Sequence, residues 1–528
     1  MSKQHWAYKT ADNLIQRKGN NTSLITCAAG ISPSGVVHAG NLREIITSDF
    51  VYRSLKTKGA NAKLIFSWDD FDRFRKVPAG IPKEFSKYIG MPYREIPDPT
   101  RSFESYAKLH ESQFEESAKQ LGIEAEFIYQ YDNYKEGKYD EQIKFALNKR
   151  KEIAEILAKN MTQGMTEEEK ENYYPISLYS RFSGNDNTKI ISFDGENKIT
   201  YKCKTTGKTD IIDITQDRQV KLSWKVDWPM RWKYESVNFE PGGSDHASPG
   251  GSYDVASQIA KEVFNIIPPK FLKYAFVRIK GATGKMSSSK GNIFSPKDLL
   301  DIYSPEMIRW LYAKPQSGAL LDVAFDSDVI KAYVEFDRRM QEFLEGKLSN
   351  EKAQEVALSF INGQKPISNP APFRQIVGMG DATDFNKETI NKLLSMSNQS
   401  YNNESISDRL KKGEIWMTKY FSEARSNLLE IPNTKYYKNL NPDQKNLFNE
   451  FTKLVDKKEE MTYAQIEKEI YSIAKKPDMT DEEKKSAQRD FFKIIYNLLF
   501  GKDRGPRLPT FLWAVPKTKL ENIIHQTK

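Results

Sequence analysis

The sequence predicts an α/β fold built on a parallel sheet, with an insertion inside the sheet domain and an all-α C-terminal region. Three observations support this prediction. A strand, a turn, a helix and a second strand follow one another within residues 24–70, a further strand-like run stands at residues 272–277, and strand patterns stop near residue 330. Because βαβ connections place their two strands parallel, these segments predict one parallel sheet.

The βαβ unit begins with a short apolar run at residues 24–29, which is typical of a buried strand. A turn rich in Ser, Pro and Gly follows, and from about His38 apolar residues recur at helical spacing. The second strand, residues 63–66, leads into Trp68, Asp69 and Asp70. Ligands of such sheets bind beyond the carboxyl ends of the strands, so the residues that follow each strand are candidates for a site.

The remaining chain predicts three further segments. Residues 96–220 are charged and then turn-rich, which indicates an insertion between a first half of the sheet domain at 1–95 and a second half at 221–330. Residues 331–528 are predicted to be helical, with capping-box spacing at Thr462 and Thr480 and a helix end at Gly501. The polar stretch 368–386 is predicted to be a linker or a long loop.

Composition excludes several classes of protein. The 528 residues are 38% hydrophobic and 29% charged, which suits several packed domains, and no stretch predicts a membrane helix or a signal core. We therefore expect a cytoplasmic protein with no membrane partner. Cys27 and Cys203 are the only cysteines, too few for a disulfide framework or a structural zinc site.

The net charge is +9, and residues 401–528 hold 24 Lys and Arg against 19 Asp and Glu. This surplus is compatible with a polyanionic partner, but the charge alone is better explained by a solvated basic surface.

Two motifs carry the chemistry that we expect. The first, GISPSGVVHAGN at residues 30–41, joins a strand to a helix start, where backbone N–H groups and the helix dipole favour phosphate and His38 adds a donor. The second, GATGKMSSSKGN at residues 281–292, presents Lys285 and Lys290 on a Gly/Ser-rich loop that can close over a triphosphate. Taken separately, a helix-capping histidine and a basic linker explain them; together, in this order, they are far more specific.

With these motifs in view, the chain resembles the class I aminoacyl-tRNA synthetases, whose paired signatures are written HIGH and KMSKS. SWDDFDRFRKVP at residues 67–78, WKVDWPMRW at 224–232 and EPGGSDH at 240–246 narrow the resemblance to the class I, archaeal-type lysyl-tRNA synthetases. GKDRGPRL at 501–508 is similar to the end of the anticodon-binding domain of bacterial glutamyl enzymes. The resemblance implies a Rossmann-type catalytic domain with a connective insertion and a helical anticodon-binding domain.

The resemblance also implies roles for individual residues. It assigns His38, Asn41, Lys285 and Lys290 to catalysis. The residues that it implies for ATP binding are Pro33, Ser34, Gly35, His38, Gly40, Asn41, Gly243, Asp245, Lys285, Met286, Ser287, Ser288 and Lys290. Those that it implies for lysine binding are Gly30, Ser32, Asp69, Asp70, Trp224 and His246.

The implied reaction joins lysine to tRNA(Lys). ATP, accompanied by Mg²⁺, converts L-lysine to lysyl-adenylate, and the lysyl group passes to the 2′-hydroxyl of the terminal adenosine of the tRNA. Related enzymes carry a second cysteine near the position of Cys203, which is missing here, so we expect no zinc in the insertion. A monomer is favoured. Two alternatives stay open: a glutamyl-type synthetase, which Arg73 and Arg75 suit, and a non-catalytic tRNA-binding relative.

Overall fold

The computed structural model describes residues 3–19, 22–244, 246–280, 293–361, 363–364, 367–396 and 399–527. The chain divides into two compact units. The N-terminal unit comprises Met1–Val323 and Glu342–Lys365, and the C-terminal unit comprises Ala324–Gln341 and Pro366–Lys528. Among the described helices, none is long and apolar enough to cross a membrane.

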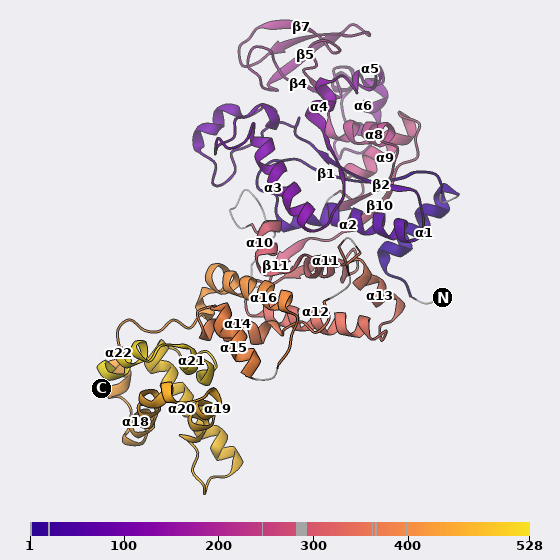
Figure 1. The fold of residues 1–528 in the computed structure, drawn as a ribbon. Coiled ribbons are helices and arrows are strands. Elements are labelled where there is room, and N and C mark those ends of the chain that lie inside the picture. The colour runs from indigo at the N-terminus through magenta and orange to yellow at the C-terminus, as the bar shows by residue number, and fades with distance from the viewer. Residues whose placement is uncertain are drawn as a thin grey trace. The chain divides into compact units, whose positions relative to one another are not determined.

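A five-stranded parallel sheet forms the centre of the N-terminal unit (Figure 1). Its spatial order is β10-β9-β1-β2-β3. The chain adds β2 and β3 on one side of β1, and later adds β9 and β10 on the other side. The strands are β1 (Ile25–Ile31), β2 (Ala62–Trp68), β3 (Glu126–Tyr129), β9 (Val237–Gly243) and β10 (Lys270–Tyr274). The strand order therefore reverses between β1 and β9, where parallel sheets bind ligands.

Helices cover both faces of this sheet. α2 (Ala39–Thr57) connects β1 to β2 and packs on β1, β2 and β9, and α1 (Trp6–Lys18) packs on α2. α8 (Trp224–Tyr234) and α9 (Ser252–Glu262) bury a second apolar cluster on the other face, which includes Ala28, Ile65 and Val237. Side chains that alternate between these layers explain why β1 reads as a continuous apolar run.

The edge strand β3 lies inside the range expected for the insertion. α3 (Tyr106–Gln120) leads into β3, which pairs with β2 from Ile65 to Trp68. The excursion from the sheet therefore begins after Tyr129 and ends before Val237, later than the expected start at residue 96. β3 is only four residues long, and such a short strand carries little periodicity.

The excursion has its own hydrophobic core. A three-stranded antiparallel sheet, β5-β6-β7, and a two-stranded sheet, β4-β8, join short helices (Figure 1). The elements are α4 (Gln130–Lys135), α5 (Asp140–Asn148), α6 (Arg150–Lys159), α7 (Glu167–Glu171), β4 (Ile176–Leu178), β5 (Thr188–Phe193), β6 (Lys198–Cys203), β7 (Thr209–Asp213) and β8 (Val220–Leu222).

The strand-like run expected at residues 272–277 is divided between two sheets. β10 ends at Tyr274, and β11 (Val277–Ile279) pairs instead with β12 (Leu321–Val323). The N-terminal unit also contains α10 (Pro296–Ile302), α11 (Pro305–Ala313) and α13 (Asn350–Ala357), and α12 (Asp328–Leu344) crosses the boundary of the two units.

Helices are the only regular elements among the described residues of the C-terminal unit (Figure 1). Capping boxes start α19 at Thr462 and α20 at Thr480, and Gly501 ends α20 with a φ of 67°. Residues 368–386, expected to be a linker, contain a helix, α14. The helices of this unit after α12 are α14 (Phe373–Ala382), α15 (Lys387–Met396), α16 (Asn403–Ile415), α17 (Thr434–Lys438), α18 (Pro442–Lys457), α19 (Tyr463–Ser472), α20 (Asp481–Phe500), α21 (Leu508–Ala514) and α22 (Lys517–Thr527).

Candidate active site

A cavity of about 480 Å³ opens at the carboxyl ends of β1, β2 and β9, where the strand order reverses. Its volume lies within the range of small-molecule sites. The residues that line it come from both halves of the sheet domain: Gly30, Ile31, Ser32, Ser34, His38, Gly40, Asn41, Glu44, Asp69, Asp72, Arg75, Trp224, Gly243, His246, Tyr274, Phe276 and Val277.

The N-terminus of α2 forms one wall of the cavity. His38 is the N-cap residue: its Nδ1 accepts from the N–H of Asn41 at 3.2 Å, and the Asn41 side chain accepts from the N–H of His38 at 3.3 Å. Because Nδ1 is an acceptor, the neutral ring carries its proton on Nε2, which makes Nε2 a donor. The same histidine thus caps the helix and lines the cavity beside a dipole that favours anions.

Gly30 is required by the close approach of β1 and β2. A Cβ at this position would lie 2.9 Å from the carbonyl oxygen of Ser67 and 3.2 Å from its Cβ. A methyl group would therefore push the two strands apart directly beneath the cavity.

We expect Gly30→Ala to lower the free energy of unfolding by about 1–3 kcal/mol, the usual range for overpacking a core. Thermal unfolding of the two proteins measures the change. Gly318→Ala is the matched control, because a Cβ at residue 318 would meet no atom within 4 Å. Equal stability of the two variants would show that β1 and β2 separate at no cost.

A chain of buried and half-buried charges reaches the lining of the cavity at Asp69 and Asp72. Asp69 Oδ1 lies 2.7 Å from Arg231 Nη1, and Asp72 Oδ1 lies 2.8 Å from Lys221 Nζ. Asp227, which is fully buried, lies 3.3 Å from both Lys221 Nζ and Arg231 Nε. Asp72 also accepts from the Ser32 hydroxyl at 3.0 Å, which brings the chain of charges to the cavity lining.

The burial of these groups and their mutual attraction act in opposite directions on their pKa values. Burial raises the pKa of Asp69, and Arg231 only partly opposes this change. Burial also acts to raise the pKa of Asp72, but Lys221 and the Ser32 hydroxyl hold it below its ordinary value. Burial would lower the pKa of Lys221, whereas Asp227 and Asp72 raise it, so Lys221 stays protonated.

The aromatic rings of Trp224 and His246 also line the cavity. Trp224 stacks on Trp228 with their centroids 4.8 Å apart, and the guanidinium of Arg231 lies 5.1 Å from the centroid of Trp224. His246 packs edge-on against Trp228 at 5.7 Å. Trp224 thus lines the cavity while it packs partly into the core. An indole in the lining of a cavity suits a cationic ligand.

The cavity brings together many of the residues expected from the sequence. Gly30, Ser32, Ser34, His38, Gly40, Asn41, Asp69, Trp224, Gly243 and His246 all line it. Pro33 and Gly35, in the turn between β1 and α2, are not part of the lining. Asp245, Lys285, Met286, Ser287, Ser288 and Lys290 lie outside the described residues.

Asp70 lies away from the cavity lining. It is fully buried, and its Oδ1 accepts from the N–H of Tyr131 at 2.7 Å, beside the end of β3. Burial, with the nearby Glu111, raises the pKa of Asp70 well above its ordinary value. Asp72, two residues further along, lines the cavity together with Asp69.

Four polar residues of the lining are not among the residues expected to bind ATP or lysine: Glu44, Asp72, Arg75 and Tyr274. Glu44 accepts a hydrogen bond from the hydroxyl of Tyr274, which joins α2 to β10. Glu44 follows Asn41 by three residues, so both lie on one face of α2. This spacing could have indicated Glu44 as a residue of the site. Asp72 and Arg75 belong to the motif at residues 67–78, but the sequence assigned Asp72 no role and named Arg75 only for the glutamyl alternative.

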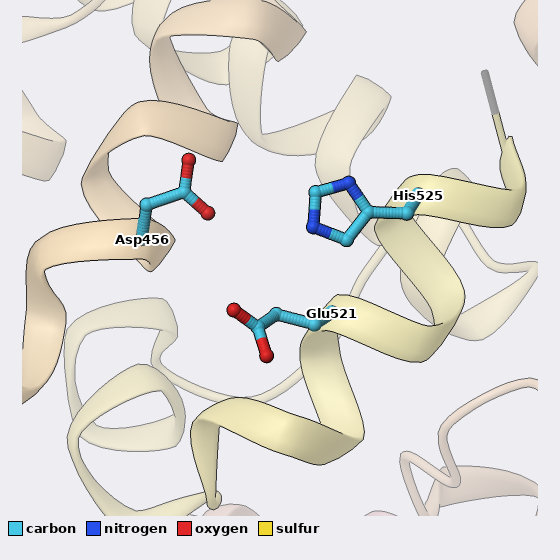
Figure 2. A group of neighbouring side chains, drawn as sticks. All are labelled: Asp456, Glu521 and His525. Atoms are coloured by element: carbon cyan, nitrogen blue, oxygen red, sulfur yellow. The ribbon is translucent and has the colours of Figure 1, made fainter.

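Within the described residues, one group of side chains has the composition of a metal site, and it lies in the C-terminal unit (Figure 2). Glu521 and His525 on α22 and Asp456 on α18 bring ligand atoms within 4.8 Å of one another. Asp456 and His525 are exposed, and Glu521 Oε1 lies 3.5 Å from Lys517 Nζ. Such exposed groups often meet without an ion, so we assign no metal to them. Cys203 is buried and is not part of this group.

The fold and the cavity are those of the class of α/β proteins that bind nucleotides at the switch point of a parallel sheet. The family described as tRNA synthetases class I (K) matches residues 4–363. The chain therefore belongs to this family of class I aminoacyl-tRNA synthetases.

Relatives match the chain over nearly its whole length. The lysine–tRNA ligase of Pyrococcus horikoshii is 34% identical over 97% of this chain and 98% of its own. That of Thermococcus kodakarensis is 35% identical over 96% and 97%, and that of Borrelia garinii subsp. bavariensis is 35% identical over 99% of each chain. Among solved structures, the glutamate–tRNA synthetase of Elizabethkingia anophelis covers 96% of this chain and 99% of its own, with 11% identity and a TM-score of 0.44, too weak a likeness to bear on the substrate.

Proposed function

We propose that the chain is a lysine–tRNA ligase. It activates L-lysine with ATP, supplied as its magnesium complex, and transfers the lysyl group to the 2′-hydroxyl of the terminal adenosine of tRNA(Lys). The lining of the cavity, which includes the carboxylates of Glu44, Asp69 and Asp72 and the indole of Trp224, supports the choice of a cationic amino acid. Carboxylates and an aromatic face both attract an ammonium group. The three relatives named above are lysine–tRNA ligases and support the same choice.

In the first step, the carboxylate of lysine attacks the α-phosphorus of ATP. A C–O–P bond forms, and the bond to pyrophosphate breaks. The substrate carboxylate is already ionised at neutral pH, so no protein base is needed, and catalysis consists of alignment and stabilisation of phosphate charge. His38, with the N-terminus of α2, lines the cavity where those charges develop. We assign Lys285 and Lys290 to the same task on the basis of the family motif.

In the second step, the 2′-hydroxyl of the tRNA attacks the lysyl carbonyl, and AMP leaves. We assign anticodon recognition to the C-terminal unit, because its helices belong to the part of the chain that carries much of the basic surplus. Single-stranded bases are read through stacking and cationic groups, which such a surface supplies. We propose that the protein acts as a cytoplasmic monomer.

Amino-acid-dependent exchange of pyrophosphate into ATP tests this proposal. Exchange with lysine and not with glutamate is the expected result. Exchange with glutamate alone would establish the glutamyl alternative, which Arg75 at the cavity would then serve. No exchange with any amino acid, with or without tRNA, would favour a non-catalytic tRNA-binding relative.

We expect Trp224→Ala to raise the KM for lysine about tenfold, with little change in the KM for ATP, because the indole contacts the cavity from the side of Asp69 and Arg231. Exchange kinetics against lysine and ATP separate the two constants. Trp513→Ala, in the C-terminal unit, is the control for loss of a partly buried indole. Equal effects on both KM values would mean that Trp224 supports the fold rather than the substrate.

A further inference from the structure

One buried lysine is not explained by the chemistry above. Lys221, on β8, is 3% exposed, and it is not among the residues that line the cavity. Lysine is almost never fully buried unless it is paired, because its desolvation is costly. Its place therefore depends on its partners.

Those partners connect the excursion to the cavity. Lys221 Nζ lies 2.8 Å from Asp72 Oδ1 and 3.3 Å from Asp227 Oδ2. Behind Asp227, the hydroxyl of Tyr134 donates to its carboxylate, and the N–H of Leu222 donates to the same hydroxyl oxygen at 3.2 Å. Lys221 is thus fixed from behind by groups of α4, α8 and β8, and it faces a carboxylate that follows β2.

The carboxylate of Asp72 has two different neighbours. Its Oδ1 faces Lys221 and its Oδ2 accepts from Ser32, so both oxygens are held and the group has one orientation. Ser32 and Asp72 both line the cavity, whereas Lys221 and Asp227 do not. Among the described residues, Lys221 is the only ion-pair partner of Asp72 Oδ1.

Stability alone does not account for this arrangement. Replacing buried ion pairs by apolar side chains of similar size is often neutral or stabilising, so a buried lysine is a costly means of packing β8. The chain of contacts ends at the cavity rather than within the core. A role in substrate binding explains both why a lysine is buried here and why its contacts lead to the cavity.

We infer that Lys221 is a positioning residue for the amino acid substrate: it holds the carboxylate of Asp72 against Ser32, so that Asp72 presents a fixed negative charge to the ammonium of the bound amino acid. The inference rests on the proposed activation of an amino acid in this cavity. It also assigns a task to the excursion, whose returning strand β8 delivers Lys221 to the end of β2, 149 residues away along the chain.

A double-mutant cycle tests the inference, with amino-acid-dependent pyrophosphate exchange as the readout. Asp72→Asn is expected to raise the KM for lysine on the order of 10- to 100-fold, and Lys221→Met roughly tenfold, with the KM for ATP unchanged. Because Lys221 acts through Asp72, adding Lys221→Met to Asp72→Asn should change the KM for lysine by less than about twofold. Lys221→Arg, which keeps the charge, should recover part of the loss.

The cycle also guards against misfolding. If Lys221→Met alone does not fold, the double variant, which removes both charges, is compared with Asp72→Asn. Equal KM values support the inference, and a further rise in the double variant overturns it. An unchanged KM for lysine in a folded Lys221→Met protein also overturns it. Lys458→Met, at another buried lysine but in the C-terminal unit, is the control and should leave both KM values unchanged.

Failure of the proposed function would be seen separately. It would appear in the unaltered protein, as exchange that does not depend on lysine. The amino acid that does support exchange then replaces lysine in the cycle, and the same comparison of single and double variants decides the role of Lys221.

Discussion

His38→Ala is expected to lower the rate of lysine-dependent pyrophosphate exchange on the order of 10²- to 10³-fold, with the KM for lysine little changed. The imidazole lines the cavity at the N-terminus of α2, where we propose that it donates to phosphate charge as the α-phosphorus is attacked. A group that acts on developing charge affects kcat more than substrate binding. Steady-state exchange kinetics at saturating ATP measure the effect.

His38 also caps α2, so loss of the cap alone must be separated from loss of chemistry. His38→Asn is the matched control, because an asparagine side chain is a good N-cap acceptor for the N–H of Asn41. Stability should fall by about 1 kcal/mol in His38→Ala and little in His38→Asn, whereas exchange should be lost in both. If His38→Asn restored exchange, the histidine would serve only to cap the helix.

The parts of the fold that could be predicted from the sequence are those with strong local signals. The apolar run of β1, the turn after it and the cap at His38 lie in one continuous segment, and the start of α2 is where the sequence predicts it. The capping boxes at Thr462 and Thr480 are confirmed for the same reason, since a cap is a contact between residues three apart.

The parts that could not be predicted depend on long-range pairing. β3 has four residues and acquires its identity only by pairing with β2. β10 and β11 read as one run, and they separate because β11 pairs with β12 instead of joining the central sheet. Residues 368–386 are polar and contain Pro and Gly, yet α14 forms there because Phe373, Ile376 and Val377 find a core to pack on.

The residues of the candidate site also form two groups: those that a local motif predicts and those that only long-range contacts distinguish. His38, Asn41 and Ser34 lie in one local motif at the helix start, whereas Asp72 could be distinguished from Asp69 and Asp70 only by its partners. Ser32 and Lys221 meet Asp72, Arg231 meets Asp69, and the N–H of Tyr131 meets Asp70. Three carboxylates within four residues thus have three different environments, which no spacing rule distinguishes.

Arg231→Met is expected to lower the free energy of unfolding of the N-terminal unit by about 3–5 kcal/mol, the usual cost of removing one partner of a buried ion pair. The substitution leaves Asp69 and Asp227 buried without the guanidinium that lies 2.7 Å from one and 3.3 Å from the other. Urea unfolding followed by tryptophan fluorescence measures the loss, because Trp224, Trp228 and Trp232 surround the same region.

Arg278→Met is the control, because Arg278 also pairs with an aspartate at 2.8 Å, Asp322, but both side chains are nearly half exposed. Water already solvates that pair, so its loss should change stability little. The loss of unfolding free energy caused by Arg231→Met should become smaller as the pH is lowered from about 8 to about 5.5. A buried carboxyl with a raised pKa takes up a proton in the folded state before it does so in the unfolded chain, and acid therefore favours the folded variant. Equal losses in the two variants at every pH would show that Arg231 is as well solvated as Arg278.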